Sequence, residues 1–137
     1  MATEFLCKAC RGVLNVKTSI VLAAQNLKNA KRGLVFLNPD IGNYTITTHA
    51  SFKIIEGEEF LYTCPICHSR LNSAKYDHLV RIIMVDDNRK EYDIYFSDIA
   101  GEKCTYKISG HQIEKQGPDA NLYNKYFDLP EEDRKYL

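Results

Sequence analysis

Two stretches of sequence decide the fold: Cys7-Lys8-Ala9-Cys10 near the start of the chain and Cys64-Pro65-Ile66-Cys67 near its middle. In each, a two-residue spacer lets both sulfur atoms face one metal ion at about 2.3 Å. Together the pairs supply four thiolates, which complete the tetrahedral shell of a structural zinc site. We therefore expect one structural Zn²⁺ ion, bound by Cys7, Cys10, Cys64 and Cys67, that joins two distant parts of the chain.

Two other uses of these cysteines are open. An electron-transfer iron site uses similar Cys pairs, and Cys64-Pro65-Ile66-Cys67 is similar to the Cys-Pro-x-Cys of glutaredoxins, whose first thiolate lies at a helix N-terminus. Here the pair follows a predicted hairpin instead of the first strand of a βαβ unit, and poor helix formers follow it. The twin pair at the chain start favours metal. A four-cysteine shell has no open position, so the ion would be structural and not a Lewis acid.

The composition is that of an ordinary globular protein. The 137 residues are 45% hydrophobic and 26% charged, with a formal net charge of zero, and this length suits one main domain. The chain shows neither a secretory signal nor an apolar stretch of about 20 residues that could span a membrane. Cysteines without an export signal fit a reducing compartment. We therefore expect a cytoplasmic protein that does not associate with membranes.

The pattern of apolar residues predicts mainly β structure. The clearest hairpin joins Leu79–Val85 to Tyr92–Ser97, because β-branched and aromatic residues flank a turn rich in Asp and Asn. A second hairpin is expected between Ser51–Ile55 and Glu59–Thr63. Thr18–Leu27 is ambiguous, since its first half favours a strand and its second half suits a helix. Further strands are expected at Phe5–Leu6, Gly12–Leu14, Leu34–Leu37, Tyr44–Thr48 and Cys104–Ile108.

The end of the chain differs from this pattern. A Gly-Pro break is followed by Asp119, which could cap a short helix over Ala120–Phe127 with aromatic side chains on one face. The last residues are polar and acidic. We therefore divide the chain into a zinc-stapled β domain over residues 1–117 and a C-terminal helix and polar tail over residues 118–137.

The remaining cysteine and the histidines fit no catalytic motif. Cys104 has Lys103 beside it, but a nucleophilic role would need an activating base or a helix terminus, so a buried strand cysteine is expected. His68 follows Cys67 directly, but four sulfurs make it unnecessary as a ligand. Three other histidines have no spacing typical of a metal site or a catalytic triad and are expected to be exposed or hydrogen-bonded: His49, His78 and His111.

The charge is unevenly distributed. Residues 1–53 contain seven Lys and Arg but only two acidic residues, and the rest of the chain carries the balancing negative charge. Such asymmetry either makes the two halves attract each other or marks an anionic partner. The aromatic residues on the predicted strands also have two interpretations: they pack in the core, or they form a platform on which nucleic-acid bases stack. The candidate contacts to nucleic acid or another anion are Lys17, Lys28, Lys31 and Arg32.

The two cysteine pairs, with about fifty mostly β residues between them, resemble the β-tent group. This group includes Yippee-type proteins, methionine-R-sulfoxide reductases and the ligand-binding domain of cereblon. The resemblance implies two antiparallel sheets that lean together while zinc clamps their edges. The chain has no Trp for a cereblon-type cage, and the neighbours of Cys104 do not match the reductase strand, so neither property is carried over. The residues that carry the resemblance are Phe5–Leu14, Arg32–Leu37, Gly42-Asn43-Tyr44 and Tyr62–Leu71.

These observations predict a mainly β fold: two small antiparallel sheets clamped by a four-cysteine zinc site, as a β-tent or an extended zinc ribbon, with a short C-terminal helix. The first functional hypothesis is a non-enzymatic, cytoplasmic zinc-binding adaptor or regulatory protein that binds a protein partner. The C-terminal helix and tail would either contact this partner or pack on the body of the protein. The second is a nucleic-acid-associated zinc ribbon acting in transcription or on ribosome or RNA. The third is a thiol-dependent redox enzyme using Cys104 or Cys64. The oligomeric state stays open.

Overall fold

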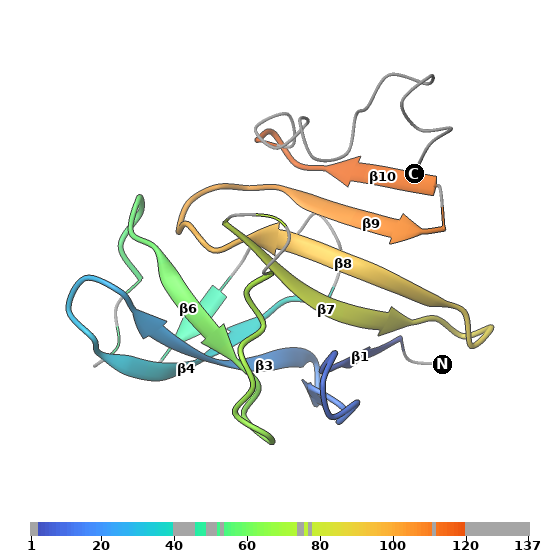
Figure 1. Cartoon of the computed structure of the whole chain (residues 1–137), viewed down its shortest axis with the longest axis horizontal. Helices are drawn as coiled ribbons and strands as arrows, with labels where there is room; N and C mark the ends of the chain where they lie inside the picture. Colours follow the sequence, from blue (N-terminus) through green and yellow to red (C-terminus); the bar gives the residue numbers. More distant parts are fainter. Residues whose placement is uncertain are drawn as a thin grey trace.

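The protein consists of two antiparallel β-sheets (Figure 1). The structure, a computed structural model, describes residues 3–39, 46–48, 52, 54–73, 76, 78–110 and 112–119. Within these ranges there is no helix. The prediction of a mainly β fold with two antiparallel sheets is therefore confirmed. The helix predicted at 120–127 lies outside the described residues.

The first sheet has five strands in the order β1-β7-β8-β9-β10. Its centre is the hairpin that the sequence predicts most clearly, in which Ile82 is paired with Ile94. β1 pairs antiparallel with β7, so the start of the chain is an edge of this sheet. The strands are β1 (Glu4–Leu6), β7 (Leu79–Val85), β8 (Glu91–Ser97), β9 (Thr105–Ser109) and β10 (Gln112–Gln116).

The second sheet has the order β2-β3-β4-β5, and β6 also pairs with β3. The ambiguous segment Thr18–Leu27 forms its central strand. Ala23 and Gln25 are paired with β4 on one side and with β6 on the other. Because both edges of this strand are hydrogen-bonded, tertiary pairing overrides the helix preference of its Ala and Gln residues. The strands are β2 (Asn15–Val16), β3 (Ser19–Asn26), β4 (Arg32–Leu37), β5 (Ile46–Thr48) and β6 (Phe60–Thr63).

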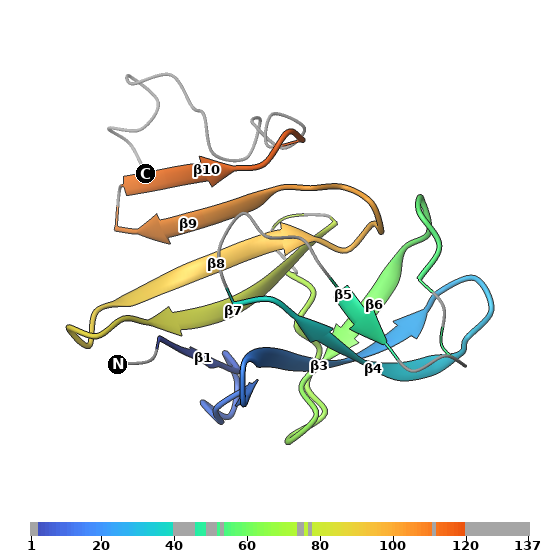
Figure 2. The same ribbon diagram turned by 180° about the vertical axis from the view of Figure 1, so that it is seen from behind.

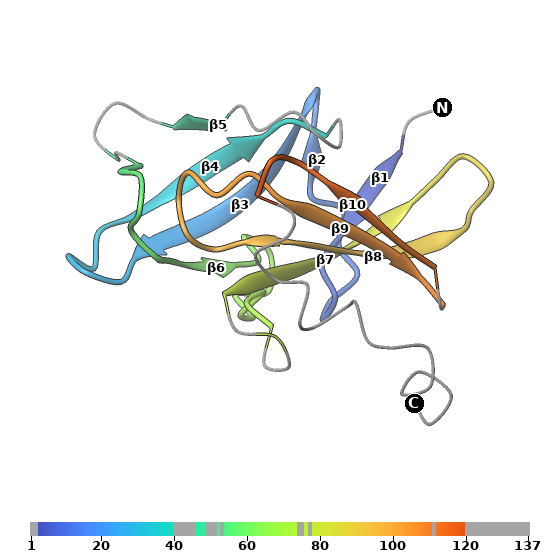
Figure 3. The ribbon, with the colours of Figure 1, turned by 90° about the horizontal axis from the view of Figure 1, so that it is seen from above.

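The main hydrophobic core lies between the two sheets. Figures 2 and 3 show β3 and β4 on one side of the molecule and β7 and β8 on the other. Aromatic rings interlock in this core: Tyr62 of β6 meets Phe96 of β8 edge to face, with 5.6 Å between ring centroids. The buried side chains that form the core include Phe5, Leu14, Ile20, Leu22, Val35, Phe60, Tyr62, Leu71, Val80, Ile82, Met84 and Ile94.

In the described part of the chain, the backbone passes between the sheets twice. It leaves the first sheet after β1 and enters the second at β2, and it returns to the first sheet between β6 and β7. Each crossing contains one of the two Cys pairs, because Cys7 directly follows β1 and Cys64 directly follows β6. The fold therefore places both pairs at the junction of the two sheets.

Two further comparisons with the sequence-based expectations concern strand pairing. β6 pairs with β3 and not with the segment before it, and the described residues of 51–55 belong to no strand. The expected second hairpin is therefore wrong, although a turn is present where Glu58 N–H donates to the carbonyl of Ile55. β10 was not expected, because its largely polar sequence shows no β pattern.

The described part of the chain contains no helix with the length and apolar character that crossing a membrane requires.

Candidate metal centre

Each Cys pair lies in a tight turn that we call a knuckle: residues 7–12 form the first and residues 64–69 the second. In the first knuckle, the N–H of Arg11 donates to the carbonyl of Cys7 (2.9 Å) and the N–H of Cys7 donates to the carbonyl of Gly12 (3.0 Å). The backbone N–H groups of Ala9 and Gly12 point at the sulfurs of Cys7 and Cys10, both at 3.3 Å. These amide dipoles stabilise negative charge on the two sulfur atoms.

The second knuckle repeats this geometry position by position. The N–H of His68 donates to the carbonyl of Cys64 (2.9 Å), and the N–H of Cys64 donates to the carbonyl of Ser69 (3.0 Å). The N–H of Ile66 lies 3.3 Å from Cys64 Sγ. The fourth residue after the first cysteine is left-handed in both turns, with φ of 59° at Arg11 and 66° at His68. The two knuckles therefore have the same backbone geometry, and each presents its sulfurs from a different crossing between the sheets.

The four sulfur atoms converge on one point. All four lie within 4.8 Å of one another. Cys7 Sγ is 3.7 Å from Cys67 Sγ, and Cys10 Sγ is 3.9 Å from Cys64 Sγ. In a tetrahedral shell with metal–sulfur bonds of about 2.3 Å, neighbouring sulfurs are about 3.8 Å apart. All the cysteines are free thiols, so the cluster is not a pair of disulfides. The four cysteines can therefore hold a metal ion without rearrangement.

The electrostatics of the cluster favour a bound cation. Cys7 and Cys64 are buried, whereas Cys67 is partly exposed and Cys10 is exposed. Burial raises the pKa of the Cys64 thiol to about 12, while hydrogen bonds from Ser69 lower the pKa of Cys67 to about 6. The protein alone thus stabilises one thiolate well and opposes another. A divalent cation at the centre would supply the positive charge that four neighbouring thiolates need.

The predicted basic residues do not form one patch. Lys28 and Lys31 lie in the turn between β3 and β4, and Arg32 is the first residue of β4. Lys17 precedes β3 at its other end. The eight residues of β3 span about 26 Å at 3.3 Å per residue. Lys17 is therefore well separated from the other three basic residues. All four are exposed.

Cys104 lies apart from the metal centre. It is buried in a small second core with Leu79, Tyr95 and Tyr106. Burial and then the charge of Glu102 raise its pKa to about 12, so the thiol is neutral at physiological pH. The sequence-based prediction of a buried cysteine agrees with this placement.

A cavity of about 330 Å³ lies between the sheets. Apolar residues such as Ile20, Ile82 and Phe96 form most of its wall, and Glu102 and Lys103 lie among the polar residues that line it. Its size is at the lower end of the range for small-molecule sites. The four clustered cysteines are not among its described lining residues, so the metal centre and the cavity are separate features.

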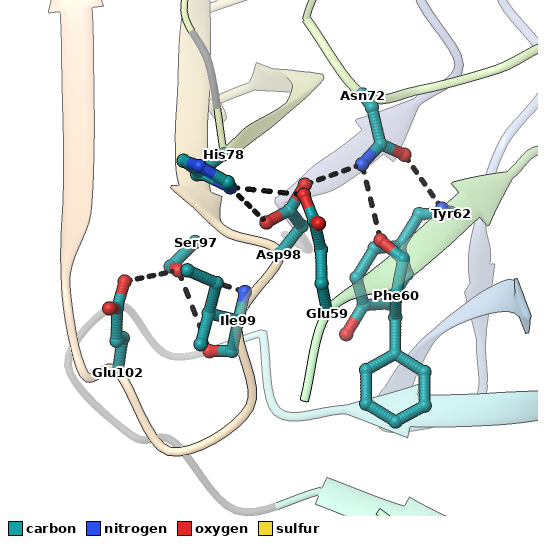
Figure 4. Close-up of polar contacts among 9 residues, drawn as sticks. All are labelled: Glu59, Phe60, Tyr62, Asn72, His78, Ser97, Asp98, Ile99 and Glu102. Atoms are coloured by element: carbon teal, nitrogen blue, oxygen red, sulfur yellow. Dashed lines mark hydrogen bonds and ion pairs between the residues drawn. The ribbon is translucent and has the colours of Figure 1, made fainter. Parts of the chain in front are cut away.

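The structure also brings together three residues that the sequence did not single out as a group: Glu59, His78 and Asp98 (Figure 4). His78 Nδ1 lies 3.0 Å from Glu59 Oε2 and 3.5 Å from Asp98 Oδ1. Burial, and then the charge of Glu59, raise the pKa of Asp98 to about 6. Partial burial lowers the pKa of His78, but the charges of Asp98 and Glu59 outweigh this effect and raise it. We call these three residues the Glu-His-Asp cluster.

The sequence offered no signal for this cluster. Its members are spaced like no metal or catalytic motif, and His78 alone was expected to be an ordinary exposed or hydrogen-bonded histidine. They meet because Glu59 forms an isolated β-bridge with Ile99, next to Asp98. The backbone then links the other two residues, since the N–H of Asp98 donates to the carbonyl of His78 (2.8 Å).

Comparison with models of known protein families, with curated proteins and with solved structures found no match. The class of the protein is therefore defined by its own fold and site: a two-sheet β protein with a four-cysteine cluster, able to hold a metal ion, at the junction of the sheets.

Proposed function

We propose that the chain binds one structural Zn²⁺ ion through Cys7, Cys10, Cys64 and Cys67 and acts as a non-enzymatic adaptor or regulatory protein. The observation that carries this proposal is the convergence of the four sulfurs, with separations of 3.7 and 3.9 Å against about 3.8 Å in a tetrahedral thiolate shell. Soft thiolates in this tetrahedral geometry select zinc or iron; we propose zinc, and elemental analysis distinguishes it from a four-cysteine iron site.

The proposed role of the ion is structural. Four thiolates fill a tetrahedral shell and leave no position for a water molecule or a substrate. The ion would connect the two crossings between the sheets and so fix the angle at which the sheets lean on each other, as in β-tent proteins. Its binding free energy, about 10–16 kcal/mol in small zinc modules, is comparable with the whole stability of an ordinary domain. The fold would then depend on its metal.

The chemistry of the thiols supports a non-enzymatic role. Reactive cysteines are accessible and have lowered pKa values, whereas Cys104 is buried with a raised pKa. Cys64 is buried in the cluster and would be a metal ligand. A thiol-dependent redox enzyme, the third hypothesis, would need one of these two sulfurs to reach a substrate.

Exposed apolar side chains beside the metal centre support the binding of a protein partner. Ile66, at the tip of the second knuckle, is 56% exposed, and Val13, which directly follows the first knuckle, is 46% exposed. Ile66 packs close to the first knuckle, since a Cβ on Gly12 would lie 2.6 Å from Ile66 Cδ1. Exposed apolar groups that gather at one place are typical of interaction sites.

The test combines metal content with partner capture. Elemental analysis of reduced, folded protein should give one zinc ion per chain, and Cys7→Ser should lose it. Extracts treated with nuclease should then yield a protein partner that the wild type captures and an Ile66→Asp variant of equal zinc content does not. Metal-free folded protein would refute the zinc site. Capture that nuclease abolishes, and that a charge reversal of Lys28, Lys31 and Arg32 also abolishes, would favour the nucleic-acid hypothesis instead.

A further inference from the structure

We propose that the Glu-His-Asp cluster is a second metal site, which binds a divalent first-row transition-metal ion through Glu59, His78 and Asp98. One imidazole nitrogen and two carboxylates form a mixed donor set of the kind that suits Mn²⁺, Fe²⁺ or Zn²⁺. The three ligand atoms lie within 4.8 Å of one another. This site does not depend on the four-cysteine centre.

Two of the three separations match cis positions around one ion. Ligands about 2.1 Å from a metal are about 3.0 Å apart at octahedral angles and about 3.4 Å apart at tetrahedral angles. His78 Nδ1 lies 3.0 Å from Glu59 Oε2 and 3.5 Å from Asp98 Oδ1. The cluster therefore needs little rearrangement to accept an ion between these atoms.

The second observation is a buried oxygen without a hydrogen bond. The side chain of Asp98 is only 4% exposed, and its Oδ1 accepts no hydrogen bond from the described residues. This oxygen lies 3.5 Å from His78 Nδ1 (Figure 4). A buried carboxylate oxygen that has an ion-pair contact but accepts no hydrogen bond is incompletely satisfied, and a cation bound there would compensate for that cost.

The other oxygen of Asp98 is held by a supporting residue. Asn72 Nδ2 donates to Asp98 Oδ2 (2.8 Å) and to the carbonyl of Phe60 (3.2 Å), and Asn72 Oδ1 accepts from the N–H of Tyr62 (2.7 Å). Asn72 is thus fixed on β6 and orients the carboxylate, as the outer residues of metal sites do.

The position of the cluster indicates what the ion would do. Glu59 directly precedes β6 in the second sheet, whereas His78 directly precedes β7 and Asp98 directly follows β8 in the first. Cys64 follows the other end of β6, about 17 Å away along the strand. The two candidate metal sites thus lie at opposite ends of β6. Because Glu59 and His78 are 39% and 45% exposed, the second ion could also bind water and exchange with solvent.

The test adds Mn²⁺ to the zinc-loaded, full-length protein, since this hard ion does not compete for thiolates. Electron paramagnetic resonance of free Mn²⁺ should show saturable binding of one equivalent. Glu59→Gln should weaken that binding at least tenfold, and Asp98→Asn should abolish it. Glu56→Gln is the matched control, because it removes the same charge from an exposed site outside the cluster. Each variant is first required to keep its zinc and its melting temperature.

Three outcomes would overturn the proposal. They are no saturable binding by the wild type, binding that Glu59→Gln leaves unchanged, and displacement of Mn²⁺ by equimolar Ca²⁺, which avoids nitrogen ligands. If Asp98→Asn does not fold, Glu59→Gln decides the test, because Glu59 is half-exposed. A zinc-free but folded protein would refute the four-cysteine site and leave this test valid.

Discussion

Cys7 and Cys67 are 60 positions apart in the chain, yet their sulfur atoms lie 3.7 Å apart. One of them follows the edge strand of the first sheet, and the other follows a strand of the second sheet. A contact between them therefore determines how the two sheets meet, and a metal ion at this point would hold the whole core together.

The first prediction concerns metal removal. A strong chelator, or the substitution Cys64→Ser, should remove the zinc and abolish cooperative thermal unfolding, because the binding free energy of about 10–16 kcal/mol rivals the total stability of a domain. Differential scanning calorimetry with elemental analysis measures both effects. Cys104→Ser serves as the control and should keep its zinc. The same melting temperature with and without chelator would contradict the prediction.

The second prediction follows from the raised pKa of Cys104, about 12. A thiol is neutral below its pKa, so at pH 8 only about one molecule in ten thousand carries the Cys104 thiolate. Iodoacetamide should therefore label Cys104 in the native protein very slowly, and the rate should rise about tenfold per pH unit without a plateau below pH 10. Mass spectrometry after timed quenching measures the rate. Fast labelling of Cys104 at pH 7 in zinc-loaded protein would contradict this prediction and support the hypothesis of a thiol-dependent redox enzyme.

The third prediction concerns the contact between Gly33 of β4 and Phe52. A Cβ atom on Gly33 would lie 2.5 Å from Phe52 Cγ, and the Phe52 ring already packs edge to face on Phe60. Gly33→Ala should therefore destabilise the protein by about 1–3 kcal/mol, as measured by urea unfolding. The cause is checked in a Phe52→Ala background, which removes Cγ and the ring, and there the same substitution should cost clearly less. Equal costs in both backgrounds would exclude the steric explanation.

The fourth prediction concerns the turn after β3. Asn26 is buried, its Oδ1 accepts the N–H groups of Lys28 (2.8 Å) and Asn29 (3.3 Å), and its Nδ2 donates to Glu58 (3.1 Å). Asn26→Ala should cost about 1–3 kcal/mol because it leaves these groups without their partner. Asn29→Ala, which removes one exposed contact to Lys31, should cost much less. Similar costs for both substitutions would show that burial of Asn26 is unimportant.

Local patterns in the sequence predicted part of this structure well. The hairpin of β7 and β8 could be predicted because its β-branched and aromatic residues and its Asp-rich turn are local signals. The metal-ligand set could be predicted because a spacer of two residues fixes the geometry within each pair. Thr18–Leu27 could not be assigned, since its strand conformation depends on partners on both edges. The Glu-His-Asp cluster could not be predicted either. It forms because Glu59 and Ile99 pair in a long-range β-bridge, and the spacing of the three residues in the sequence does not indicate this pairing.

The pairing of β1 with β7 has a consequence for synthesis on the ribosome. β1 is translated before its neighbour β7 (Leu79–Val85), so β1 stays unpaired on the nascent chain until that strand has been made. For part of that interval, until Cys64 and Cys67 are translated, the first cysteine pair has no second pair to complete its shell and is open to oxidation or to the wrong metal. Contacts between such distant segments also form slowly. A cell that makes this protein would therefore benefit from delivering zinc, or a protecting chaperone, before translation ends.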